Sequence, residues 1–94
     1  MEKRIGVVSV LVEERKSVQE LNTLFSAYSG IIIGRMGIPV RDRGIYIISL
    51  IVEGTTDQIG AMTGKAGRLA GVQVKSVLTG YREVKDEHTS ENIS

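Results

Sequence analysis

Two glycine-rich stretches of the sequence resemble loops that bind phosphate. They are SGIIIGRMG at 29–37 and GAMTGKA at 60–66. A dinucleotide fingerprint, GxGxxG, requires its first two glycines one residue apart and a helix directly behind them, but the first stretch has a longer gap and leads into a strand. The phosphate loop GxxxxGK[ST] is one residue longer than the second stretch, in which Ala66 also replaces the hydroxyl that would hold magnesium. We therefore expect neither stretch to bind a nucleotide.

Side chains that catalyse reactions or bind transition metals are scarce. The chain has no cysteine, and its single histidine, His88, lies near the C-terminus. One chain therefore cannot supply a thiol nucleophile or a set of histidine and cysteine ligands. We expect no enzyme activity, no metal and no cofactor. The alternative is a small acylphosphatase-like enzyme; despite Arg15, the sequence lacks its arginine-bearing phosphate loop, and an assay with acyl phosphates tests this alternative.

A charged loop precedes the first expected helix. It contains Glu13, Glu14 and Arg15, and Ser17 stands at the start of the helix. The free amides of a helix N-terminus attract carboxylate and phosphate groups. This loop is therefore a candidate ligand site, and the alternative is a solvated surface loop.

A second group of charges surrounds the segment 35–43. It includes Arg35, Arg41 and Arg43, but the chain has a net charge of only +1, one Phe and no Trp. A strong positive field and stacked aromatic residues, which nucleic-acid-binding domains use, are thus lacking. We expect no direct binding of nucleic acid. A transcription-linked nucleic-acid-binding protein remains the alternative function, and strong salt dependence of its affinity would support it.

The hydrophobic pattern predicts four strands. Two of them are apolar at nearly every position, which is typical of central strands buried on both faces. The last alternates Val72 and Val74 with Gln73 and Lys75, as an edge strand does. We expect the four strands at 4–12, 31–40, 45–52 and 71–81.

Two helices separate these strands. Ser17 with Glu20, and Thr55 with Gln58, each form the pattern of a capping box at a helix start. Gly30 stands where a helix takes a left-handed C-terminal turn. The sequence therefore predicts that the first helix runs from Ser17 to just before Gly30.

The second half of the chain repeats the first half. Apolar helix positions such as Val18 and Ile59 are 41 positions apart, and so are Gly30 and Gly71, the glycines behind the two helices. Two strand–helix–strand units of this kind form the α+β ferredoxin-like βαββαβ sandwich. We expect a four-stranded antiparallel sheet of order 4-1-3-2 with both helices on one face.

One face of this sheet is left uncovered by the helices. Val8, Val10, Ile47 and Ile51, or their neighbours of opposite parity, must point to that face. Broad apolar surfaces are unusual on monomers, so we expect another copy of the chain to cover it, in a dimer or a tetramer. The alternative is an unusually apolar monomer.

The second helix contains a stripe of glycines. Gly60, Gly64 and Gly67 are spaced four and three residues apart. Three interior glycines cost about 2 to 3 kcal/mol relative to alanine. Close approach of another backbone or a ligand along the stripe would offset this cost, so we include the three glycines among the interface candidates. The alternative is that tertiary packing tolerates them.

The 94 residues are enough for one domain. We assign residues 1–82 to it, and we expect the polar segment 83–94 to be a disordered tail. The apolar runs are too short to span a bilayer, and no targeting leader precedes them. We expect a cytoplasmic protein that does not contact membranes.

The segment SGIIIGRMGIPVRDRGIYIISLIVEGTTDQIGAMTGKAGRLAGVQVKSVLT resembles the ACT-like ligand-binding domains. Among these it is similar to the C-terminal sensor domain of the nickel-responsive transcription regulators. The SGIIIGRMG and KAGRLxGVxVK segments are most similar to the short iron-only hydrogenase system regulators, and the similarity extends from Arg4 to Arg82. It implies an ACT-like regulatory domain that binds a small effector, such as an amino acid, or a protein partner at the interfaces of a homo-oligomer.

Some positions depart from the nickel regulators. Their metal-binding histidines and cysteine correspond here to Gly37, Pro39 and Gly44, none of which can bind nickel. The chain also begins directly with a strand, where those regulators carry a DNA-binding arm, so direct DNA binding is not expected. By position in the ACT-like fold, an effector would lie between the loop 12–17 and the segment 34–37 of a neighbouring subunit. This implies the ligand-binding candidates Glu13, Glu14, Arg15, Ser17, Gly34, Arg35, Met36 and Gly37.

Overall fold

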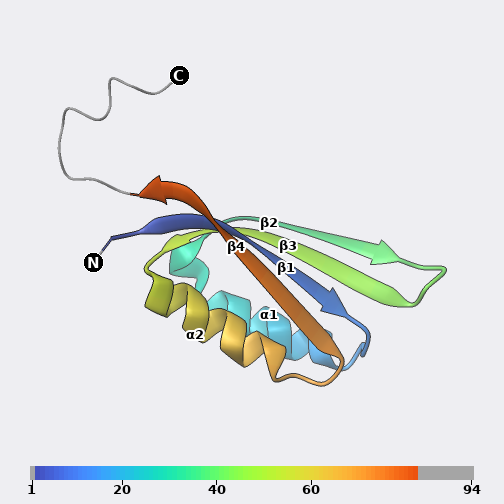
Figure 1. Cartoon of the computed structure of the whole chain (residues 1–94). Helices are drawn as coiled ribbons and strands as arrows, with labels where there is room; N and C mark the ends of the chain where they lie inside the picture. Colours follow the sequence, from blue (N-terminus) through green and yellow to red (C-terminus); the bar gives the residue numbers. More distant parts are fainter. Residues whose placement is uncertain (1, 83–94) are drawn as a thin grey trace.

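The computed structural model of the chain describes residues 2–82. Its elements are β1 (Arg4–Val12), α1 (Ser17–Ala27), the 3₁₀ turn η1 (Ser29–Ile31), β2 (Ile32–Val40), β3 (Ile45–Gly54), α2 (Thr56–Gly67) and β4 (Val72–Arg82). The strands form one antiparallel sheet of order β2-β3-β1-β4. Both helices lie on the same face of the sheet (Figure 1). This confirms the α+β ferredoxin-like fold, because the predicted order 4-1-3-2 is the same order read from the other edge.

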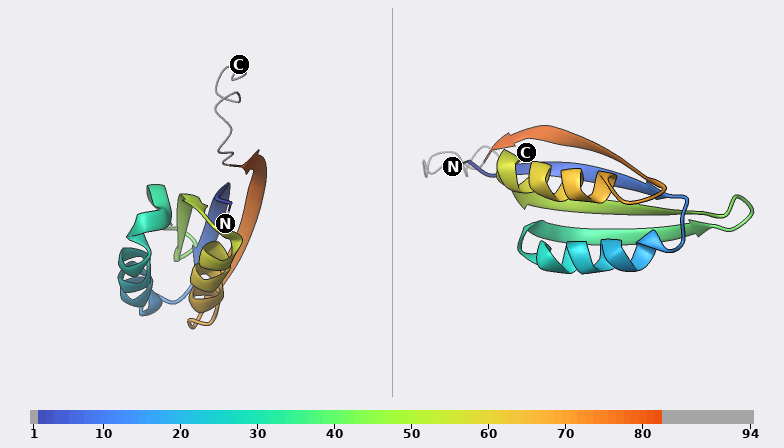
Figure 2. Two further views of the ribbon diagram at one scale, coloured as in Figure 1. Left: turned by 90° about the vertical axis from the view of Figure 1, so that its left-hand side faces the viewer. Right: turned by 90° about the horizontal axis from the view of Figure 1, so that it is seen from below.

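The hydrophobic core lies between the sheet and the two helices. Every second residue of the central strands points into it, which follows from the alternation of side chains along a strand. The core residues are Val8, Val10, Val12, Leu21, Phe25, Ile31, Ile48, Leu50, Val52, Ile59, Met62, Ala66 and Val72. Figure 2 gives a view along the strands and a view onto the helix layer; in both, the helices lie on one side of the sheet, and no described element covers the other side.

Two of the interface candidates lie in this core. Val8 is 1% exposed and Val10 is fully buried, so their assignment to the uncovered face is wrong. Their neighbours Val7 and Ser9 occupy that face instead, because adjacent residues of a strand point to opposite sides. When a strand is apolar on both faces, its sequence does not show which residues point to the core. The packing of the helices against one face of the sheet determines this.

The uncovered side of the sheet is largely apolar, and we call it the open sheet face. The strand register places Val7 between Ile51 and Val77 in one row, and Leu11 beside Ile47 in another. Val7 and Ile51 remain 39% and 38% exposed in the single chain. The open sheet face is formed by Val7, Ser9, Leu11, Met36, Ile38, Ile47, Ser49, Ile51, Lys75 and Val77.

The two predicted capping boxes have different outcomes. At α2, Thr55 accepts from the Gln58 amide and the Gln58 side chain accepts from the Thr55 amide, so that capping box is confirmed. At α1 the helix does begin at Ser17, but Lys16 precedes it without a side-chain cap. The Ser17 hydroxyl is buried and donates a 2.6 Å hydrogen bond to the carbonyl of Ala70. The expected capping box at Ser17 is therefore wrong, because the hydroxyl of Ser17 is hydrogen-bonded to Ala70 in the other repeat and does not cap the helix.

The two repeat-related glycines also differ. Gly71 has a φ of +67°, as a left-handed turn requires. Within the described residues the only other positive φ is at Gly44, so the left-handed turn expected at Gly30 is wrong. The chain leaves α1 through η1 instead, with the amide of Ile31 donating to the carbonyl of Tyr28 at 3.0 Å.

The glycine stripe of α2 is open on its outer side. A Cβ atom on Gly60 or Gly64 would meet nothing within 4 Å, and one on Gly67 would only touch Val74 at 4.0 Å. The stripe borders a shallow groove between α2 and β4. No close approach within residues 2–82 therefore requires these glycines.

Replacing Gly64 with alanine should stabilise the chain. Alanine is favoured over glycine in a helix by about 1 kcal/mol, which would raise the melting temperature of a domain of this size by about 4 to 8 °C. Thermal unfolding followed by circular dichroism measures this shift. A lower melting temperature would contradict the prediction and indicate that a second chain or a ligand packs on the stripe.

The segment 83–94, predicted to be a disordered tail, lies outside the described residues. Among residues 2–82, no helix is long and apolar enough to cross a membrane.

Candidate functional site

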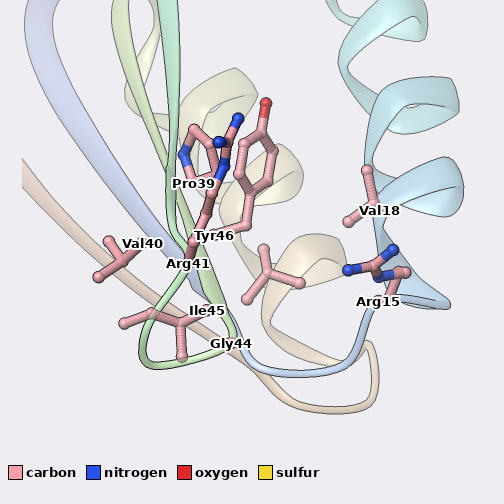
Figure 3. Close-up of a pocket in the computed structure, with 9 residues that line it drawn as sticks. Arg15, Val18, Pro39, Val40, Arg41, Gly44, Ile45 and Tyr46 are labelled. Atoms are coloured by element: carbon pink, nitrogen blue, oxygen red, sulfur yellow. The ribbon is translucent and has the colours of Figure 1, made fainter.

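A pocket lies where the β2–β3 hairpin extends past the helix layer towards the start of α1. Its volume is about 500 Å³. Figure 3 shows Arg15 and Val18 on the α1 side, facing the hairpin residues across the pocket. We call it the hairpin pocket; it is lined by Val12, Arg15, Val18, Pro39, Val40, Arg41, Gly44, Ile45 and Tyr46.

The hairpin turn positions one side of the pocket. The amide of Arg43 donates to the carbonyl of Val40 at 3.1 Å, and the amide of Gly44 donates to that of Arg41 at 3.3 Å. Gly44 has a φ of +68°, a conformation that residues with a Cβ atom rarely adopt. These contacts reverse the chain directly after Arg41 and return it to the sheet at Ile45.

The loop between β1 and α1 positions the other side. The amide of Glu13 donates to the carbonyl of Gly71 at 2.7 Å, and the amide of Val18 donates to the carbonyl of Arg15 at 3.1 Å. The buried Ser17 hydroxyl ties the start of α1 to Ala70. Arg15 is thus carried by a loop that is fastened to the segment between α2 and β4.

Tyr46 forms a wall of the pocket and packs over a glycine of the adjacent strand. A Cβ atom built on Gly37 would overlap the Tyr46 hydroxyl and lie 2.9 Å from Cζ of its ring. The ring can occupy this place only because Gly37 has no side chain. Gly37 therefore positions Tyr46 without lining the pocket itself.

Replacing Gly37 with alanine should move the Tyr46 ring. The clash involves the far end of a side chain that can rotate, so the free energy of unfolding should fall by less than about 1 kcal/mol. NMR of the Tyr46 ring resonances reports the displacement. The matched control is Gly34→Ala on the same strand, where the added methyl meets nothing within 4 Å. An unmoved Tyr46 ring in Gly37→Ala would contradict this role.

The hairpin pocket offers binding groups more than catalytic ones. Its lining consists of aliphatic side chains, two guanidinium groups and one phenol hydroxyl. Guanidinium groups bind carboxylates and phosphates through paired hydrogen bonds. Within residues 2–82, no three His, Cys, Asp or Glu side chains come together as a possible metal site.

The residues of the loop 12–17 that were predicted to bind a ligand lie in different places in the structure. Arg15 lines the hairpin pocket. Glu13 and Glu14 are exposed outside it, and Glu14 lies against Gly71. Ser17 is fully buried and bonded to Ala70, so its assignment as a ligand-binding residue is wrong.

The predicted residues of β2 divide between the two faces of the sheet. The register places Gly34 and Met36 on the open sheet face, opposite Ile51 and Ser49. Arg35 points to the helix layer, where its guanidinium donates to Asn22 Oδ1 and lies 5.3 Å from the centre of the Phe25 ring. Within one chain, these residues and the loop 12–17 therefore do not form a single site.

Most lining residues of the hairpin pocket are not ones that the sequence marks as ligand-binding. Arg41, Tyr46, Pro39 and Val18 were not among the ligand-binding candidates. The signal was the turn 41–44, whose glycine between two apolar strands indicates a hairpin and places Arg41 at its tip. A single aromatic residue such as Tyr46 carries no comparable signal.

Comparison with known protein families assigns the chain to one of them. The model of the TM1266-like family, described as iron-only hydrogenase system regulators, matches residues 4–76. The chain belongs to this family. All lining residues of the hairpin pocket fall inside the region that the TM1266-like model matches. A search of curated proteins gives no match.

Solved structures agree with the family and the fold. The uncharacterized protein TM1266 from Thermotoga maritima is 36% identical with a TM-score of 0.78, over 81% of this chain and 96% of its own. An unknown protein from Galdieria sulphuraria is 16% identical with a TM-score of 0.60, over 84% of this chain and 46% of its own. A formyltetrahydrofolate deformylase from Pseudomonas putida is 7% identical with a TM-score of 0.60, over 82% of this chain and 30% of its own. The last two show similarity of fold alone.

Proposed function

We propose that this member of the TM1266-like family is a non-enzymatic regulatory domain that binds a small effector in the hairpin pocket and acts as a homo-oligomer. The observation that carries the proposal is the lining of the pocket. It combines apolar walls with two guanidinium groups, and among residues 2–82 it includes no carboxylate, imidazole or thiol. Such a lining can hold and orient a ligand, but it supplies no general base or strong nucleophile for acting on it.

The open sheet face supports self-association. Large apolar side chains are exposed on it, including Met36 at 60%, Ile38 at 50% and Val77 at 67%. Contiguous apolar surface of this kind marks an interface, and a symmetric dimer covers the same surface on both copies at once. We propose that a second copy packs on the open sheet face.

The hairpin connects the pocket with this interface. Pro39 and Tyr46 line the pocket, while their neighbours Ile38 and Ile47 point to the open sheet face. A ligand that holds the hairpin against α1 therefore also fixes residues that contact the second copy. Through this coupling, an effector that binds in the pocket would change how the domain assembles or which partner it binds. A regulator requires such a link between two sites.

Light scattering during gel filtration tests self-association, and a hydrolysis assay with acyl phosphates tests the enzymatic alternative. The proposal predicts a dimer or tetramer at micromolar concentration and no hydrolysis above the uncatalysed rate. A stable monomer or rapid turnover would contradict it.

A further inference from the structure

The charged residues that line the hairpin pocket are both cationic. Among the described lining residues, Arg15 and Arg41 carry the charges, while Glu13, Glu14 and Asp42 lie beside them outside the lining. Within residues 2–82, neither guanidinium forms a hydrogen bond or an ion pair. Arg35 is different, since Asn22 and the Phe25 ring already engage it. The pocket thus presents two cationic groups without a partner of opposite charge.

The two groups come from different parts of the chain. Arg15 belongs to the loop that leads into α1, and Arg41 belongs to the hairpin turn. Figure 3 places them on the two sides of the pocket, with Val18 beside Arg15 and Tyr46 beside Arg41. An anion between these sides would be attracted by both, and it would draw the hairpin towards α1.

The remaining walls require an apolar ligand body. Val12, Val18 and Pro39 are apolar lining residues of the same pocket. A volume of about 500 Å³ lies within the range of pockets that hold small molecules. An α-amino acid would bring an ammonium group into this pocket, where none of the described lining residues carries a carboxylate to pair with it, and leaving such a charge unpaired is costly.

We infer that the hairpin pocket takes a small organic anion with an aliphatic body and no ammonium group, its acidic group lying between Arg15 and Arg41. This inference rests on the proposed effector function of the pocket and narrows its ligand class. The acidic group is a carboxylate or a phosphate ester, because guanidinium groups bind both. The effector is therefore different from the amino acid that the family resemblance suggested.

A titration of the full chain followed by amide NMR tests the inference. The probes are 4-methylpentanoate, isopentyl phosphate, uncharged 4-methylpentanamide and L-leucine. At least one of the two anions should shift resonances of residues 12–18 and 39–46. The amide and leucine should bind at least about tenfold more weakly, since one hydrogen-bonded charge is worth about a factor of ten or more. The acidic group is identified by whichever anion binds more tightly.

Replacing Arg41 with glutamine should weaken binding of the preferred anion about tenfold. The matched control is Arg43→Gln, in the same exposed turn but outside the pocket lining, which should leave the affinity unchanged. Because both changes lie in the exposed turn, both variants should keep the wild-type melting temperature. Equal weakening by the two variants would overturn the assignment of Arg41.

The outcomes separate the ligand class from the proposed function. If leucine or the amide binds in the pocket as tightly as the anions, the inferred ligand class is wrong and the effector site stands. If none of the four probes shifts the pocket resonances at tens of millimolar, both the ligand class and the effector function of the pocket are overturned.

Discussion

Replacing Ile51 with lysine is expected to separate the homo-oligomer into monomers. Ile51 lies within the open sheet face, in the same row as Val7 and Val77. A second copy packed there would bury the new ammonium group against apolar side chains, which costs more than the contact can supply. The dissociation constant should rise at least about a hundredfold, equivalent to about 2.8 kcal/mol. Sedimentation velocity across a concentration series measures the change.

The matched control places the same charge on the helix side of the molecule. Ala61 is exposed on α2, so Ala61→Lys should leave the assembly unchanged. Both variants should retain the circular dichroism spectrum of the wild type, because neither residue belongs to the core. Dissociation by Ala61→Lys, or an intact oligomer in Ile51→Lys, would show that the copies meet elsewhere.

Replacing Gly71 with alanine should have the largest effect on stability among the glycine substitutions considered. Its φ of +67° disfavours any residue with a Cβ atom. That atom would also lie 2.9 Å from Glu14 Cβ and 3.0 Å from the Glu14 amide nitrogen. Strain and crowding together should lower the free energy of unfolding by about 2 to 3 kcal/mol. Urea unfolding monitored by circular dichroism gives this value.

The repeat supplies the control for this substitution. Gly30 occupies the equivalent position behind α1, but it has no positive φ, and a Cβ atom there meets nothing within 4 Å. Gly30→Ala should therefore change the free energy of unfolding by no more than about 0.5 kcal/mol. Similar losses in the two variants would contradict the specific role assigned to Gly71. Gly71→Ala should also disturb the amide resonance of Arg15, because Arg15 lies in the same loop as Glu13 and Glu14, which contact Gly71.

The fold was predictable because its signals are periodic and local. Apolar strands, helices with apolar residues three and four apart, and a repeat of 41 residues specify a ferredoxin-like sandwich. The left-handed turn expected at Gly30 was a local error, but the others concern contacts between distant segments. The Ser17 hydroxyl bonds Ala70 across the two repeats, and the parity of Val8 and Val10 depends on which face the helices cover. Local pattern determines neither of these contacts.

The site was less predictable than the fold. Arg15 was found because a charged loop before a helix is a recognisable feature of a sequence. Arg41 and Tyr46 join it only because the β2–β3 hairpin extends past the start of α1, and Gly37 matters through the ring that packs on it. Arg35 illustrates the opposite error, since its position in the ACT-like fold suggested a ligand but its guanidinium is engaged by α1. Residue type alone does not distinguish an arginine that is free to bind from one that holds the structure together.

Native mass spectrometry of the gently purified protein tests the central claim most directly, because it reports stoichiometry and bound ligand in one spectrum. A homo-oligomer that retains a small organic anion, released when the protein is denatured, is the predicted result. A strictly monomeric, ligand-free protein at micromolar concentration would contradict both the assembly and the effector site.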